Sequence, residues 1–226
     1  MDIDCIKGPA LVIDKQKCIN NIEKMVMKAR NNNIVFRPHF KTHQSHTVGR
    51  WFRDYGVEKI TVSSLQMAYY FARDGWKDIL VGIAYNPREY DLYRNLARDI
   101  KVCVTVAGPD SAYSLSEKCD VPLDVMLKVD TGYNRTGIKW DDTESLRQSI
   151  KSLSSNKKIN IRGLMTHDGS TYGLNSRDII FEQYISSVRR LLACREASGL
   201  DDIIVSTGDT PSASIVEKFD QIDEIR

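Results

Sequence analysis

The feature that most constrains the fold of this chain is a regular alternation of short β-branched segments with longer segments whose apolar residues recur at helical spacing. The short segments are bounded by Gly, Asn or Asp, which is typical of strands that end in turns. The predicted strands span residues 34–41, 59–64, 78–83, 101–106, 123–130, 159–166 and 202–206. Strands separated by helices in this way indicate repeated βα units and a parallel sheet.

The number of units favours a closed barrel over an open sheet. The predicted helices span residues 14–31, 45–55, 65–75, 88–98, 109–118, 142–154 and 177–199. Seven units follow a first apolar run at Leu11, Val12 and Ile13, which fits a (β/α)₈ barrel of about 250 residues. Residues 221–226 resemble the start of an eighth strand, so we expect residues 1–226 to be one barrel, incomplete at the C-terminus. The alternative is a doubly wound sheet, but no Gly-x-Gly-x-x-Gly follows the first strand.

Composition excludes several classes of function. The net charge is +2 and no basic run stands out, so neither nucleic acid nor membrane binding has electrostatic support. No apolar stretch is long enough to span a bilayer, and the first residues do not resemble a signal peptide. The five cysteines are odd in number and include no Cys-x-x-Cys pair. They indicate a reducing, cytoplasmic location.

The most informative motif is Arg37-Pro38-His39-Phe40-Lys41-Thr42-His43, at the end of the first predicted strand. Catalytic groups of a barrel lie at the C-terminal ends of its strands. Arg37, His39 and Lys41 alternate along the strand and would share one face. If that face is the interior, burial and neighbouring cations favour a neutral lysine amine, which imine formation requires. The alternative is an edge strand with solvated cations.

A second reading of this region is a metal site. His43 and His46 could lie on one helical face at a spacing that suits metal binding. No nearby Cys or carboxylate completes a familiar ligand set, so a surface or supporting role for these histidines is the competing interpretation.

The segment 206–212 follows the seventh strand and precedes a short predicted helix. Gly208 allows a tight turn, and the hydroxyls and exposed N–H groups around it suit a phosphate. Barrels often bind phosphate after strands seven and eight. A plain helix-capping turn is the alternative.

Two further strand ends carry polar loops. In the loop after 123–130, Arg135 could bind a carboxylate or a phenolate, and Lys128 could pair with Asp130. In the loop after 159–166, His167 and Tyr172 could orient or protonate an aromatic cofactor. A salt-bridged loop and purely structural side chains are the respective alternatives.

Taken together, these loops resemble the fold-type III pyridoxal-phosphate enzymes, whose barrel is the alanine racemase N-terminal domain. The Lys41 motif is similar to that of the D-threonine aldolase and D-serine dehydratase branch. The resemblance covers nearly the whole chain, from Gly8 to Arg226. It implies a C-terminal β-domain, absent from these 226 residues, that completes the active site.

The resemblance also implies roles for particular residues. Lys41 is expected to form the Schiff base with pyridoxal 5′-phosphate and to be the catalytic residue. The side chains expected around the cofactor ring are His39, Arg135, His167 and Tyr172, with Tyr172 near the pyridine nitrogen. The residues expected at the phosphate are Thr207, Gly208, Asp209 and Thr210.

The expected activity is that of a pyridoxal-phosphate-dependent lyase on small D-amino acids with a β-hydroxyl, either aldol cleavage of D-threonine type or dehydration of D-serine type. The alternatives are an amino-acid racemase, a non-catalytic cofactor carrier, and a cofactor-free sugar-phosphate barrel enzyme with Lys41 as the Schiff-base former. No metal ligand is expected within the chain. The resemblance implies a divalent metal held by residues beyond Arg226, and a homodimer.

Overall fold

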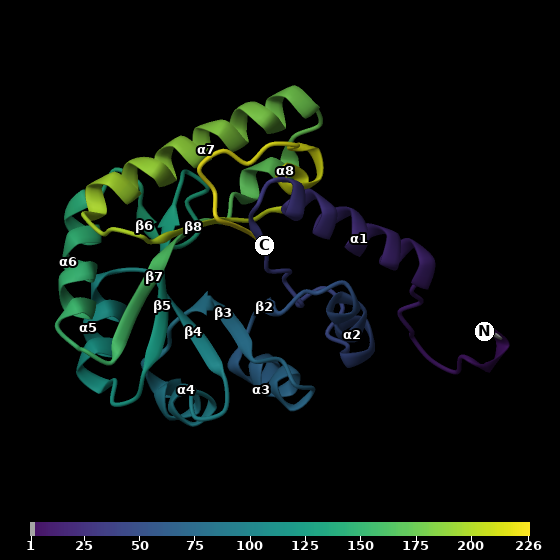
Figure 1. The fold of residues 1–226 in the computed structure, drawn as a ribbon, viewed down its shortest axis with the longest axis horizontal. Helices are drawn as coiled ribbons and strands as arrows, with labels where there is room; N and C mark the ends of the chain where they lie inside the picture. The colour runs from purple at the N-terminus through teal and green to yellow at the C-terminus, as the bar shows by residue number, and fades with distance from the viewer. Residues whose placement is uncertain (1–2) are drawn as a thin grey trace.

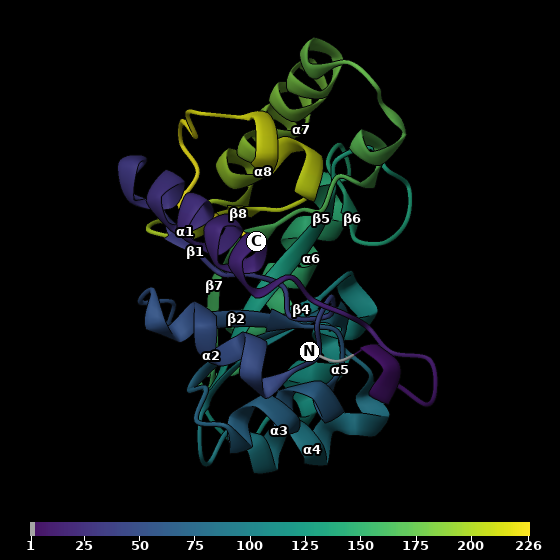
Figure 2. The ribbon, with the colours of Figure 1, turned by 90° about the vertical axis from the view of Figure 1, so that its right-hand side faces the viewer.

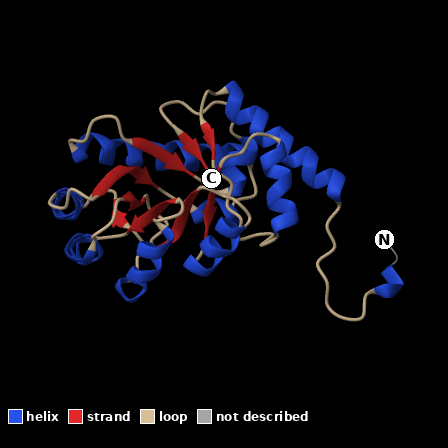
Figure 3. Ribbon diagram, turned by 60° about the horizontal axis from the view of Figure 1, so that its bottom comes forward, coloured by secondary structure: helices blue, strands red, loops and turns tan. Residues whose placement is uncertain are grey.

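The computed structural model describes residues 3–226 and shows a parallel β-barrel surrounded by helices (Figures 1 and 3). The strands are β1 (Val35–Phe36), β2 (Lys59–Val62), β3 (Asp78–Ala84), β4 (Lys101–Val106), β5 (Leu123–Asp130), β6 (Ile138–Lys139), β7 (Ile159–Met165), β8 (Ile204–Thr207) and β9 (Glu224–Ile225). The α-helices are α1 (Lys15–Asn31), α2 (His46–Asp54), α3 (Leu65–Arg73), α4 (Tyr90–Leu96), α5 (Pro109–Lys118), α6 (Thr143–Ser154), α7 (Arg177–Ser198) and α8 (Thr210–Ile215). The short 3₁₀ helices are η1 (Ile3–Cys5), η2 (Pro87–Glu89) and η3 (Gly169–Gly173).

The strand order explains why this is a barrel and not an open sheet. All neighbouring strands are parallel, in the order β1-β9-β8-β7-β5-β4-β3-β2, and β6 pairs only with β5. The two outer strands, β1 and β2, meet through a bridge between His39 and Thr61. There the Phe40 N–H donates to the Thr61 carbonyl at 2.8 Å, and the Thr61 N–H donates to the Pro38 carbonyl at 2.9 Å. The predicted (β/α)₈ architecture is therefore confirmed, and its eighth strand is β9.

The predicted strand at residues 34–41 is much shorter in the structure. The segment 34–41 forms only two residues of strand plus the bridge at His39, because Pro38 has no N–H to continue a ladder and the chain then turns at residues 40–43. The first apolar run, Leu11, Val12 and Ile13, forms no strand and is exposed. Short β6 was missed because two residues give no periodicity to detect.

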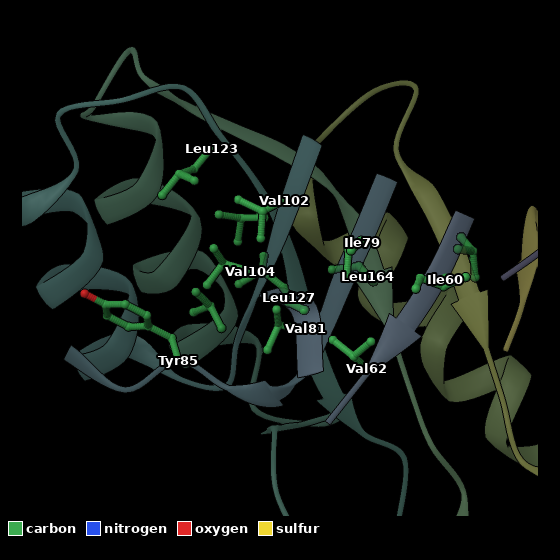
Figure 4. Packing of buried hydrophobic residues seen from close by; sticks show 14 of the residues in the cluster. Ile60, Val62, Ile79, Val81, Tyr85, Val102, Val104, Leu123, Leu127 and Leu164 are labelled. Carbon is green, nitrogen blue, oxygen red and sulfur yellow. The ribbon is translucent and has the colours of Figure 1, made fainter. Parts of the chain in front are cut away.

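The core is built from side chains that alternate between the two faces of the strands. Val102 and Val104 of β4 and Leu127 of β5 belong to the large cluster packed between strands and helices, as Figure 4 shows from close by. The alternate residues Cys103 and Met126 belong to a small separate cluster. This period of two places Lys128 and Asp130, which follow Met126 by two and four residues, on the same inner face.

Arg37 ties the first strand to the barrel interior. Its Nε donates to Glu224 of β9 at 2.7 Å, and its Nη1 donates to Asp78 of β3 at 2.7 Å. Burial disfavours the cation, but the two carboxylates more than compensate and raise the pKa of Arg37 above its ordinary value. Arg37 thus supports the barrel near the start of β3.

Helix α1 begins at an N-cap on Asp14, whose carboxylate accepts from the Lys17 N–H at 3.0 Å. Its buried face includes Ile22, Val26 and Ala29. Figures 1 and 2 show α1 beside α8, close to the C-terminal end of the chain. Within residues 3–226, no helix is long and apolar enough to cross a membrane.

Candidate active site

A pocket of about 490 Å³ opens where the loops after β1, β5, β7 and β8 converge. This volume is within the range of small-molecule and cofactor sites, roughly 300–1,000 Å³. All the residues predicted to surround the cofactor line it except Thr207. Thr207 is buried in β8, where its carbonyl accepts from the Arg226 N–H at 2.9 Å. The loops singled out from the sequence therefore meet at one place.

Lys41 lies in the turn that follows the His39 bridge. Phe40 is fully buried against Trp76 and Phe71, which fixes the start of this turn. The Lys41 N–H donates to His39 Nδ1 at 3.4 Å. The Lys41 side chain is exposed, so the burial expected from an interior strand position is not found. The turn carries the amine past the strand end and into the pocket.

Of the cations predicted near Lys41, Arg135 lines the pocket, whereas Arg37 does not. Arg37 is held by Glu224 and Asp78. Besides Lys41, the basic side chains that line the pocket are Lys24, Lys128, Arg135 and Arg226. Sequence reasoning had left Arg226 out of the site, although it alternates with Glu224 along the last strand.

Lys128 lies on the inner face of β5 and is buried. Burial, followed by Arg135 and Arg226, lowers the pKa of Lys128 to about 8, and Asp130 only partly offsets this.

The predicted pairing of Lys128 with Asp130 is wrong. Asp130 Oδ1 instead accepts from the N–H groups of Gly132 and Asn134 at 2.9 and 3.0 Å, which shapes the Arg135 loop. Among the described residues, Lys128 makes no ion pair.

Arg226 also lines the pocket. Its guanidinium donates to Ser206 Oγ and to the Thr166 carbonyl. Burial is the largest cause that lowers the pKa of Arg226 to about 10, and Glu224 opposes it. Gly208 is required beside it, because a Cβ at that position would lie 2.7 Å from both the Cβ and the carbonyl oxygen of Arg226.

Two neutral histidines line the pocket. Burial lowers the pKa of His39 to about 3, with a further contribution from Lys41. Burial also lowers the pKa of His167 to about 4. His167 Nδ1 lies 2.6 Å from the Gly208 carbonyl oxygen, and because a carbonyl only accepts, the ring proton is on Nδ1. His167 Nε2 is therefore left as an acceptor.

The Arg135 loop borders the His167 ring. The Arg135 guanidinium lies over the Tyr133 ring, 5.3 Å from its centroid. Tyr133 packs against Gly169, where an added Cβ would come within 2.3 Å of the ring. The Tyr133 and His167 rings are 6.4 Å apart between centroids, at an interplanar angle of 79°. Arg135 itself is exposed at the pocket and free of any carboxylate partner within residues 3–226.

The loop predicted to hold phosphate divides into residues that face the pocket and one that supports it. Asp209 is buried, and its Oδ1 accepts from the Ser212 N–H and the Thr171 hydroxyl, both at 2.8 Å. Its carboxylate thus caps α8, and the spacing of Asp209 and Ser212 was the signal for this role. The Thr210 N–H donates to the Tyr172 hydroxyl at 3.2 Å, which places Tyr172 against this loop.

The two histidines considered for a metal lie apart from the pocket lining. His43 is wedged among Phe40, Phe52 and Phe71, and burial lowers its pKa to about 4. His46 stacks on Tyr70 at 3.6 Å between centroids. Across residues 3–226, no group of three or more His, Cys, Asp or Glu side chains is arranged to hold a metal ion.

Helix α1 forms one side of the pocket, and the sequence analysis did not predict this contribution. The lining residues from this helix are Cys18, Asn21, Ile22, Lys24 and Met25. Their positions follow helical spacing, but only the tertiary packing of α1 beside α8 brings this face to the pocket.

Comparison with known proteins gives a consistent picture. The family model described as the alanine racemase N-terminal domain matches residues 13–226. D-threo-3-hydroxyaspartate dehydratase of Delftia sp. (strain HT23) is 29% identical over 225 residues, covering 96% of this chain and 59% of that protein. Its solved structure superposes with a TM-score of 0.92 at 28% identity, over 98% of this chain and 60% of the other.

Two further relatives extend the comparison. D-serine dehydratase of Dictyostelium discoideum is 26% identical over 188 residues, covering 76% of this chain and 47% of that protein. The structure of D-threonine aldolase from Filomicrobium marinum superposes with a TM-score of 0.87 at 20% identity, over 98% of this chain and 61% of the other, and shares the fold. The chain thus spans 59% of the Delftia protein and 47% of the Dictyostelium protein.

Proposed function

The chain belongs to the alanine racemase N-terminal domain family, and from this premise we propose that residues 1–226 are the cofactor-binding barrel of a pyridoxal 5′-phosphate-dependent lyase acting on D-amino acids with a β-hydroxyl group. The observation that carries the proposal is the convergence of Lys41, a cationic lining and the Gly208 loop on one pocket. The names of the Delftia and Dictyostelium relatives support the D-hydroxy-amino-acid class.

The donor set suits pyridoxal 5′-phosphate. The cofactor needs an accessible amine, which Lys41 provides in an exposed turn. Its phosphate needs N–H groups and cations, and Lys128 and Arg226 line the pocket while the Asp209 carboxylate is turned onto Thr171 and Ser212. His39, Arg135, His167, Tyr172, Gly208 and Thr210 are the remaining proposed cofactor-binding residues. Asp209 holds this loop through its hydrogen bonds to Thr171 and Ser212, and Thr207 is the buried strand residue that precedes the loop.

The proposed chemistry uses the cofactor as an electron sink for the bond broken at the substrate α carbon. Lys41 would hold the cofactor through Nζ, and its amine would serve as the base for the substrate α proton if the reaction is a dehydration. Arg135 is available for the substrate carboxylate because it has no carboxylate partner of its own within the described chain. His167 is held in one tautomer by Gly208 and presents Nε2 as an acceptor.

We further propose that the protein acts in the cytoplasm and as a homodimer, with any divalent metal held by residues beyond Arg226. The basis for these three points is the resemblance to the family and, for the location, the odd number of cysteines with no Cys-x-x-Cys pair.

The test of function is product identification with a panel of D-threonine, D-serine and D-threo-3-hydroxyaspartate, using the protein loaded with cofactor and extended past Arg226. A 2-oxo acid and ammonia are expected from dehydration, whereas glycine and an aldehyde indicate aldol cleavage. Racemised amino acid would replace the lyase proposal by a racemase. Bound cofactor without turnover of any of the three would favour a carrier.

A further inference from the structure

Lys28 makes a set of contacts that nothing in the proposed chemistry uses. It is buried in α1, yet its ammonium donates to three backbone carbonyls, those of Ala213 at 3.0 Å, Ser214 at 3.1 Å and Val216 at 2.8 Å. The Glu217 carboxylate lies 3.5 Å away, and its side chain is exposed. A buried lysine is unfavourable unless its donors are satisfied, and here the carbonyls satisfy them.

These carbonyls belong to the C-terminal end of α8. The last carbonyls of a helix have no partner within the helix and carry partial negative charge, so a cation there is stabilising. Asn32, one turn after Lys28, adds to the tie: its side chain donates to the Glu217 carbonyl and accepts from the Phe219 N–H, both at 3.0 Å. The end of α1 thus clamps the segment that follows α8, as the adjacency of the two helices in Figures 1 and 2 illustrates.

The other end of α8 is the proposed phosphate loop. Asp209 caps the helix, and the Ala213 N–H donates to the Asp209 carbonyl at 3.1 Å. Ala213 and Ser214, whose carbonyls Lys28 holds, also line the pocket beside Gly208 and Thr210. Because α8 has only six residues, a shift at its C-terminal end moves its first turn as well.

We propose that Lys28 is a positioning residue for the cofactor phosphate, fixing the Gly208–Thr210 loop through α8 against α1. Lys28 does not itself line the pocket, and its ammonium is already directed at three carbonyls, so it is not a phosphate ligand. The inference rests on the proposed function, because the loop is assigned there to the phosphate.

If Lys28 positions the phosphate loop, its removal should weaken binding of the phosphorylated cofactor and not of a ligand without the phosphate. The measurement is therefore the dissociation constant of pyridoxal 5′-phosphate compared with that of pyridoxal, which lacks only the phosphate. For Lys28→Met we expect affinity for the phosphorylated form to fall about tenfold, as the loss of one phosphate hydrogen bond from the displaced loop implies, while pyridoxal affinity stays within about twofold. The matched control is Lys17→Met, an exposed lysine of the same helix, which should leave both constants unchanged.

Equal losses for the two ligands would overturn the inference, since they indicate a general loosening of the barrel. An unchanged preference for the phosphorylated form would overturn it too. Lys28→Gln, which keeps one amide donor to the carbonyls, is measured in parallel in case Lys28→Met does not fold. A smaller loss confined to the phosphorylated ligand is expected for it, and a proportional loss for both ligands contradicts the inference.

Measurements on the wild-type protein distinguish a failure of the proposed function from a failure of the role given to Lys28. If it forms no covalent link with either ligand, the proposed function fails. If it prefers the phosphorylated ligand and both Lys28 variants keep that preference, only the role of Lys28 fails.

Discussion

His167 Nδ1 donates a hydrogen bond to the Gly208 carbonyl across 2.6 Å, joining the loop after β7 to the loop after β8. This contact orients a neutral ring at the pocket and holds the turn that leads into α8. It connects the ring side of the proposed site to its phosphate side.

His167→Phe keeps an aromatic ring but removes this donor. The Gly208 carbonyl then loses its partner, and we expect affinity for pyridoxal 5′-phosphate to fall roughly two- to tenfold, as the loss of one neutral hydrogen bond implies. The measurement is a titration followed by cofactor absorbance. His46→Phe is the control, because His46 stacks on Tyr70 outside the pocket lining. Unchanged affinity in His167→Phe would show that the contact has no influence on the cofactor.

Lys128 should make the affinity of the pocket for anionic ligands depend on pH. With its pKa lowered to about 8 by burial and by the neighbouring cations, the side chain is charged below that pH and neutral above it. An anionic ligand should therefore bind less tightly as pH rises from 7 to 9, by roughly five- to tenfold. Pyridoxamine 5′-phosphate is the suitable probe because it cannot link covalently to Lys41. In Lys128→Met the affinity should be weaker and should lack this fall between pH 7 and 9. The same change of affinity with pH in both proteins would refute the assignment.

Arg37 is expected to matter for stability. Removing the guanidinium leaves Glu224 buried without its ion-pair partner, and breaking a buried pair in this way costs about 3–5 kcal/mol. Urea unfolding of Arg37→Met measures the loss. Arg50→Met, which removes an exposed arginine paired with Asp74, should change the free energy of unfolding far less. Equal effects of the two substitutions would contradict the role given to Arg37.

Three half-buried histidines should make the fold acid-sensitive. Burial lowers the pKa of His39 to about 3, and of His43 and His167 to about 4, from an ordinary value of 6.5. Between these values the unfolded chain binds more protons than the folded one, so stability falls as pH falls below 6.5. From pH 7.5 to 5.5 we expect a loss of roughly 1 kcal/mol per histidine once solvent screening is allowed for.

Urea unfolding at the two pH values measures this effect. His43→Gln removes one of the three titrating groups and should reduce the difference between them. A free energy of unfolding that does not change between pH 7.5 and 5.5 would show that these histidines are not held neutral.

The barrel was predictable from local pattern, because β4 and β5 are continuous runs with clear bounds and coincide with the predicted ranges. The location of the site followed from one general rule, that strand ends converge in a barrel. That rule brought Lys41, Arg135 and His167 together without any knowledge of their contacts.

What could not be predicted depends on partners distant in sequence. Arg37 was predicted to be a cation beside Lys41 because strand alternation gives no information on Glu224, its partner 187 positions away. Asp209 looked like a phosphate-loop residue, and only its contact with Thr171 shows where its carboxylate points. Arg226 was assigned only to the start of an eighth strand, although it lines the pocket.

The central claim is that Lys41 carries the cofactor. Borohydride reduction of the protein loaded with pyridoxal 5′-phosphate, followed by peptide mapping, tests it directly. The label should lie on the peptide that contains Lys41, should persist there in Lys128→Ala, and should be absent from Lys41→Ala. A label on Lys128 in the wild-type protein, or covalent uptake by Lys41→Ala, would contradict the account.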